Sequence, residues 1–181
     1  MDNPTLIETP TVFCSKKLSD FLGLKTKRTE LSDSCEKWNG HLFYLDGRKC
    51  LIFMHKETSY SVVLLDIVKK DLANLNELFI DNFIKQLYSD KILLQDKERK
   101  IRNEYKQLSL QLTDNDKSII GSINDCVFRI QFCKNDDGNV LTNAKVYINN
   151  YLNATPMGSK KFYYAKELMK AKITSVNLTL D

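Results

Sequence analysis

The clearest pattern in the chain is a pair of apolar runs, His41–Leu45 and Arg48–Met54, joined by Asp46 and Gly47. Both joining residues tolerate the positive φ that a two-residue type I′ turn requires, so the pattern predicts a β-hairpin. In this register alternate residues share a face, and both faces are largely apolar, which indicates a hairpin covered on each side. The β-branched segment Thr58–Leu65 extends it into an antiparallel meander.

Helices are predicted both before and after the meander. A short strand at Thr11–Cys14 leads into a helix over Lys16–Leu22, which Gly23 ends. A second, charged helix is predicted over Asp96–Leu108. Between them lies the strongest helical pattern, for which Asp71 is the expected N-cap. Its apolar positions are Leu72, Leu75, Leu78, Phe79, Phe83 and Leu87.

The second half of the chain is less clear. Residues Leu108–Leu112 alternate in polarity, so a short strand competes there with the end of the charged helix. Ser118–Cys133 fits a helix capped by its first residue, although its later apolar positions also alternate as in a strand. Val140–Leu152 is predicted to be extended, and Phe162–Lys170 is predicted to form a last short helix.

These elements predict one α+β domain over residues 11–175, with an antiparallel β-meander or hairpin core covered by helices. Residues 1–10 form an N-terminal arm and residues 176–181 a C-terminal tail in this interpretation. Lys25–Lys37 is expected to be a loop, and Asn135–Gly138 a turn.

Composition favours a cytoplasmic protein. The cysteines are odd in number and form no CxxC pair, so we expect free thiols in a reducing compartment. The start of the chain lacks the cationic and apolar segments of a secretory leader. The longest apolar run, Val62–Leu65, is far shorter than the roughly 20 residues that span a bilayer, so no membrane partner is expected. The cysteines are Cys14, Cys35, Cys50, Cys126 and Cys133.

No motif indicates catalysis. A catalytic cysteine needs a nearby base, and the imidazoles available are His41 and His55. His55 points to the face opposite Cys50, whereas His41 shares the face of Cys50 and lies diagonal to it, so that contact stays open. The pattern favours a buried thiol. Paired zinc spacings and a glycine-rich phosphate loop are both missing, so we predict no catalytic residue, cofactor or metal.

The residues around the start of the Ser118 helix form the best candidate ligand site. Short hydrogen-bonding side chains gather there, and they can either cap the helix or bind a ligand. Neighbouring carboxylates such as Asp114 and Asp116 favour a turn over a metal site. The candidate residues are Asp114, Asn115, Ser118, Ser122, Asn124 and Asp125.

A basic helical face offers a second candidate. The net charge is +4, the positive surplus lies in residues 91–181, and Arg99, Arg102 and Lys106 share one face of the charged helix. The simpler interpretation is a solvated helix with a Glu98–Arg102 pair, and nucleic-acid binding is the alternative.

Three sequence blocks, taken together, suggest a family. The strings WNGHLFYLDGRKCLIFMHKET at 38–58, DNDKSIIGSIND at 114–125 and LNATPMG at 152–158 resemble an uncharacterised bacterial domain family. The resemblance covers most of residues 11–170 and implies no reaction. The arm and a charged insertion at Asp96–Lys106 depart from it.

The sequence therefore favours a non-enzymatic cytosolic module that binds another protein or a ligand. Two alternatives stay open: a nucleic-acid-binding protein that uses the basic second half, and an enzyme of unrecognised type centred on the Asp114–Asp125 loop. The sequence does not indicate the oligomeric state.

Overall fold

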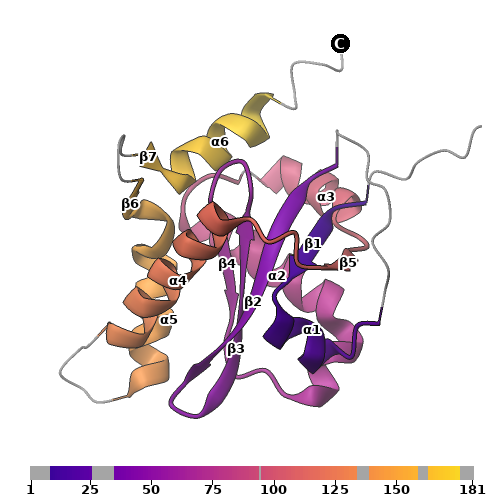
Figure 1. Ribbon diagram of the computed structural model, residues 1–181. Coiled ribbons are helices and arrows are strands. Elements are labelled where there is room, and N and C mark those ends of the chain that lie inside the picture. The colour runs from indigo at the N-terminus through magenta and orange to yellow at the C-terminus, as the bar shows by residue number, and fades with distance from the viewer. Residues whose placement is uncertain (1–8, 26–34, 94, 134–138, 159–162, 176–181) are drawn as a thin grey trace, which may run out of the picture.

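A five-stranded sheet forms the centre of the fold (Figure 1). The computed structural model describes residues 9–25, 35–93, 95–133, 139–158 and 163–175. The strand order is β4-β3-β2-β1-β5. The strands are β1 (Thr11–Cys14), β2 (Lys37–Leu45), β3 (Arg48–His55), β4 (Ser61–Leu64) and β5 (Ser109–Leu112).

The predicted hairpin is confirmed as β2 and β3. Leu45 pairs with Arg48 and Phe43 pairs with Cys50, which is the predicted register. The turn residues Asp46 and Gly47 have φ values of 49° and 75°, as a type I′ turn requires. Antiparallel pairing of β4 with β3 completes the meander.

The sheet is mixed, so the expectation of a purely antiparallel core was wrong. Strand β1 runs parallel to both of its neighbours, β2 and β5. Parallel neighbours cannot be joined by a tight turn, and here long connections containing helices join them. Periodicity within each strand carried no information about these distant pairings. The α+β class itself is confirmed.

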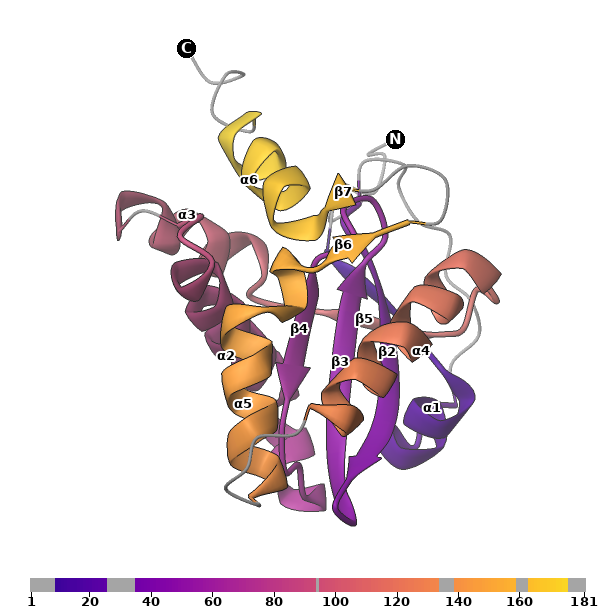
Figure 2. The same cartoon turned by 90° about the vertical axis from the view of Figure 1, so that its left-hand side faces the viewer.

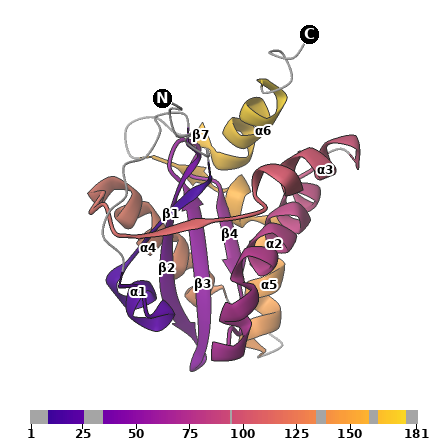
Figure 3. The same ribbon diagram turned by 90° about the vertical axis from the view of Figure 1, so that its right-hand side faces the viewer.

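Helices cover both faces of the sheet. Figure 2 shows α4 and α5 on one face, and Figure 3 shows α1 and α2 on the opposite one. Helix α6 lies at one end of the sheet, near α3. The remaining elements are α1 (Lys16–Leu22), η1 (Lys69–Asn74), α2 (Leu75–Ser89), α3 (Gln95–Glu104), α4 (Lys117–Phe132), α5 (Val140–Asn150), η2 (Leu152–Ala154), β6 (Pro156–Met157), β7 (Tyr163–Tyr164) and α6 (Ala165–Ser175).

Each face of the sheet has its own apolar core. On the α2 side, Trp38 and Phe53 of the sheet pack with Phe79 and Phe83 of α2. On the α4 side, residues of the hairpin such as Ile52 pack with α4 and α5. The prediction that the hairpin is covered on both sides is therefore confirmed.

Several boundaries differ from the sequence expectations. Val140–Leu152 is mainly helical, because Ala144 and Ile148 recur at helical spacing and are buried against the sheet. The predicted N-cap Asp71 belongs instead to the turn η1, where its carboxylate accepts a hydrogen bond from the Val68 N–H at 2.9 Å. The charged helix ends at Glu104, which leaves room for β5.

Helix α4 confirms the helical interpretation of its segment, but its cap is not the predicted one. Asp116, rather than Ser118, is the N-cap, because its carboxylate accepts hydrogen bonds from the N–H groups of Ser118 and Ile119. An N-cap residue precedes the first helical residue, and the side chain of Ser118 lies too far into the helix for that role.

Parts of the predicted arm, loop, turn and tail lie outside the described residues, namely 1–8, 26–34, 134–138 and 176–181. Among the helices that the structure describes, none combines the length and apolarity needed to cross a membrane.

Candidate functional site

Strands β1 and β5 are adjacent and parallel, and the helices that follow them leave toward opposite faces of the sheet. Helix α1 follows β1, and its Leu18 packs in the α2-side core. Helix α4 follows β5 and packs in the α4-side core. Such a divergence opens a crevice at the carboxyl ends of the two strands, where α/β proteins commonly bind ligands.

A cavity of about 310 Å³ occupies this place, which we call the β1–β5 pocket. Its volume is near the lower end of the range for ligand sites, about 300–1,000 Å³, so it suits a small molecule. Both polar and apolar side chains surround it. Its lining residues are Phe13, Ser15, Lys16, Asn39, Gly40, His41, Thr113, Asn115, Ile120, Ile123 and Asn124.

Asn39 is the most informative residue of the β1–β5 pocket. Its side chain is almost fully buried, with 3% exposed, and its Nδ2 donates a hydrogen bond to Asp114 Oδ1 at 3.0 Å. Because a carboxylate can only accept, this bond fixes the orientation of the amide. The buried Oδ1 is left with no hydrogen-bond partner among the described residues. A buried oxygen without a partner carries an unfavourable free energy of about 1–3 kcal/mol.

His41 and Ser15 form a second polar pair in the pocket, with His41 Nδ1 and Ser15 Oγ 3.0 Å apart. Ser15 also caps α1 by accepting a hydrogen bond from the Leu18 N–H. Burial, and then the charge of Lys17, lower the pKa of His41. The imidazole is therefore neutral at physiological pH, and it offers the pocket uncharged hydrogen-bonding groups.

Lys56 holds the loop between β5 and α4. Its Nζ contacts Asp114 Oδ2 at 2.5 Å and Asp116 Oδ2 at 3.0 Å. Burial alone would raise the pKa of Asp114, but the hydrogen bonds from Lys56 and Asn39 outweigh burial and keep that pKa below its ordinary value. The two carboxylates are thus compensated within the protein. Within the described ranges, no cluster of side chains could hold a metal ion.

The structure divides the predicted ligand residues into two groups. Asn115 and Asn124 line the β1–β5 pocket, and Asp114 lies directly behind it. The others face away. Ser118 is exposed, Ser122 donates to the Ser118 carbonyl in the helix, and Asp125 pairs with Arg129 at 2.6 Å.

The strand residues of the pocket, chiefly Phe13, Asn39 and His41, were not predicted from the sequence to bind a ligand. A polar residue at the interior of an apolar strand, such as Asn39, was the available signal. It indicated a polar surrounding within the core, but the neighbouring strands that create this surrounding come from distant parts of the chain.

One residue of the predicted basic face, Arg102, is engaged in ion pairs within the protein. Arg102 pairs with Glu98 of its own helix at 2.7 Å and with Asp81 of α2 at 2.8 Å. Lys106 lies beyond the end of α3, and both Lys106 and Arg99 are exposed. Arg102 is therefore already neutralised within the protein.

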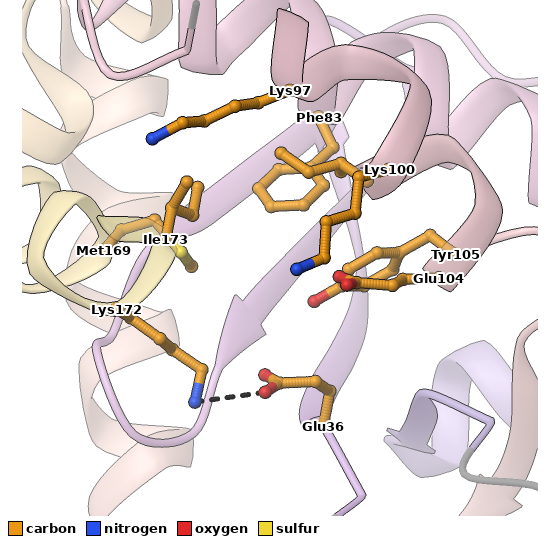
Figure 4. A pocket seen from close by; sticks show the side chains of 10 residues that line it. Glu36, Phe83, Lys97, Lys100, Glu104, Tyr105, Met169, Lys172 and Ile173 are labelled. Carbon is orange, nitrogen blue, oxygen red and sulfur yellow. Dashed lines mark ion pairs between the residues drawn. The ribbon is translucent and has the colours of Figure 1, made fainter. Parts of the chain in front are cut away.

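A second pocket lies between α3 and α6 (Figure 4). Lys97 and Lys100 extend from α3 over an apolar base that includes Phe83, while Lys172 of α6 pairs with Glu36 at 3.0 Å. The enclosed volume is only about 60 Å³. That volume holds a few water molecules rather than an organic ligand. We interpret this pocket as part of the contact by which α6 packs against the sheet.

Glu36 links this contact to His55 of the sheet. The Thr58 N–H donates to His55 Nδ1 at 3.2 Å, so Nδ1 is an acceptor and the ring proton lies on Nε2. Nε2 donates to Glu36 Oε2 at 2.6 Å. Burial alone would raise the pKa of Glu36, but the hydrogen bonds from His55 and Lys172 outweigh burial and hold that pKa below its ordinary value.

We expect Glu36→Gln to make the free energy of unfolding depend less on pH in the acidic range. A carboxylate with a lowered pKa stabilises the fold above its unfolded value of 4.5, and this contribution is lost as the pH falls through the folded value. The variant should be less stable than the wild type by about 1 kcal/mol at neutral pH. Urea unfolding should show the difference shrinking below pH 4.5.

Glu57→Gln is the matched control for this prediction, because Glu57 also pairs with Lys172 but its side chain is 69% exposed. It should change stability little at any pH. Equal behaviour of the two variants would contradict the role assigned to Glu36.

The cysteines are free thiols that lie mainly in the two apolar cores. All five are free, and all except Cys133 are buried. Burial raises the pKa of the Cys14 thiol to about 12 and that of Cys126 to about 11. Burial also raises the pKa of Cys50, whose Sγ donates to the Arg48 carbonyl. These thiols are core side chains, as the apolar neighbours of Cys14, Cys50 and Cys126 predicted.

Residues 11–168 match the model of a family described as "Domain of unknown function (DUF6933)". The resemblance to an uncharacterised domain family is thus confirmed. A search of the curated proteins finds no match.

Proposed function

Because the chain belongs to the DUF6933 family, whose description names no activity, we propose a function from the site itself. The protein is a binding module that holds a small, uncharged, hydrogen-bonding molecule in the β1–β5 pocket. The observation that carries this proposal is the position of the pocket, at the carboxyl ends of two adjacent parallel strands whose helices diverge.

The pocket residues define the chemical class of the ligand. Asn39 contributes a neutral amide to the pocket lining, and the neutral His41 offers a further hydrogen bond. Phe13, Ile120 and Ile123 provide apolar contacts. A planar molecule with N–H groups and an apolar face, such as a heterocyclic amide, satisfies both requirements.

The proposal can be tested by protein-observed NMR with uracil, nicotinamide and inorganic phosphate as separate probes at millimolar concentration. We expect the neutral heterocycles to shift the backbone amide signals of Gly40, His41 and Asn124. Phosphate should leave these signals in place, because Asn39 and the neutral His41 offer an anion no compensating charge.

Two neighbouring substitutions on α4 provide the matched comparison. Asn124→Phe places a ring in the β1–β5 pocket and should abolish the shifts, whereas Asp125→Phe, on the adjoining exposed residue outside the pocket, should preserve them. The proposal fails if the heterocycles do not shift these signals in the wild type, or if both variants respond alike.

A further inference from the structure

Strand β4 is an edge strand, and part of its backbone faces outward. The His55 N–H donates to the Tyr60 carbonyl at 2.8 Å, which identifies this pair as hydrogen-bonded. Hydrogen-bonded and non-bonded pairs alternate along an antiparallel ladder, so the peptide groups of Ser61 and Val63 point away from β3. In the described part of the chain, β4 has no strand on its other side.

The outward peptide group of Ser61 is paired by a side chain that takes the place of a strand. Asn153 Oδ1 accepts from the Ser61 N–H at 2.8 Å, and Asn153 Nδ2 donates to the Ser61 carbonyl at 3.0 Å. This is the bonding that a peptide group of a neighbouring strand would supply. The next residue of β4 whose peptide group points outward is Val63, and Val63 lines a groove.

This groove has a volume of about 560 Å³ and runs between α2 and α5 along β4. Figure 2 shows α2 and α5 side by side along the β4 edge of the sheet. One end is closed, because Ser89 Oγ donates to the Asn149 carbonyl at 2.7 Å and Gln86 Nε2 donates to the Ile148 carbonyl at 3.2 Å.

The charges of the groove are of one sign. Among its lining residues, the charged ones are Lys85 on α2 and Lys145 on α5. Side chains of an added strand would point alternately toward the two helices. Acidic residues at adjacent positions would therefore each face one of the two lysines.

From this geometry we propose that the groove binds an extended, acidic segment of another protein, which adds as a strand to β4. Main-chain hydrogen bonds to Val63 supply the affinity, and the two lysines select the acidic sequence. A second copy of the chain is a poor occupant, because its own lysines would face Lys85 and Lys145. This site lies at the sheet edge opposite to β5, so it is separate from the β1–β5 pocket.

The probe for the test is a fluorescein-labelled hexapeptide, Thr-Val-Glu-Glu-Val-Thr, with Thr-Val-Lys-Lys-Val-Thr as its control. Fluorescence anisotropy at low salt should show that the acidic peptide binds about tenfold or more tightly. In the Lys85→Glu/Lys145→Glu double variant, the preference should reverse. Hydrogen exchange of the Val63 amide should slow when the acidic peptide is added to the wild type.

Val63→Pro tests the main-chain pairing directly. Proline is tolerated on an edge strand where the N–H points outward, so the fold should persist while the affinity for the acidic peptide falls about tenfold. Should this variant unfold, the charge reversal and the hydrogen-exchange measurement still decide the matter. The proposal is overturned if the acidic peptide does not bind, if it binds without protecting the Val63 amide, or if the wild-type protein dimerises through this edge.

Discussion

Trp38→Ala is expected to lower the free energy of unfolding by about 3–5 kcal/mol, because it removes the largest side chain of the α2-side core. Trp38 is fully buried, and its ring makes edge contacts with Phe79, Phe83 and Tyr105. Its Nε1–H also donates to the Tyr105 hydroxyl at 3.3 Å. Both the ring contacts and this hydrogen bond are lost in the variant.

Urea unfolding followed by circular dichroism measures this effect, since the variant lacks the single tryptophan that fluorescence would report. Tyr44→Ala is the control on the same strand, where the side chain is 47% exposed. It should cost about 0.5 kcal/mol or less. A Trp38→Ala effect as small as the control would mean that the core is not arranged as described.

Asn153→Leu should lower the free energy of unfolding by about 3 kcal/mol or more, because it leaves buried polar groups without partners. Asn153 is 1% exposed, and it bonds both backbone groups of Ser61. It also donates to the Asp90 carboxylate at 3.2 Å. That carboxylate accepts hydrogen bonds from Tyr60 and Gln86 as well, so the substitution weakens a network that joins β4, α2 and η2.

Chemical denaturation of Asn153→Leu beside Asn150→Leu measures this contribution. Asn150 is exposed, and its side chain donates to the Val146 carbonyl within its own helix. Its replacement should change the stability by about 0.5 kcal/mol or less. Similar effects of the two substitutions would show that Asn153 is not the partner of the β4 edge.

Trp38 and Asn153 give structural roles to two of the three sequence blocks that resembled a family. The first block contains Trp38 and the hairpin, and the third contains Asn153, so both form parts of the folded framework. The second block, from Asp114 to Asp125, supplies the loop and the helix start beside the β1–β5 pocket. The first block also lines this pocket through Asn39, Gly40 and His41, so the first and second blocks both bear on the proposed function.

The sequence by itself determined the elements whose signals are local. The hairpin turn depends on Asp46 and Gly47 alone, and its register then follows from counting residues on either side. The apolar character of both strand faces indicated burial on both sides. Helix α2 was evident from its periodicity, and the buried thiols from their apolar neighbours.

Only the tertiary structure decided the rest, because it depends on contacts between distant residues. The parallel pairing of β1 with β2 and β5 brings together segments far apart in the chain, and no local pattern encodes that choice. Val140–Asn150 forms a helix because one of its faces is buried in the α4-side core. This burial outweighs the strand preference of its β-branched residues. The β1–β5 pocket likewise exists only where β1, β2, β5 and α4 meet. Asn124 lines it and Asp125 does not, because successive residues of a helix point in different directions.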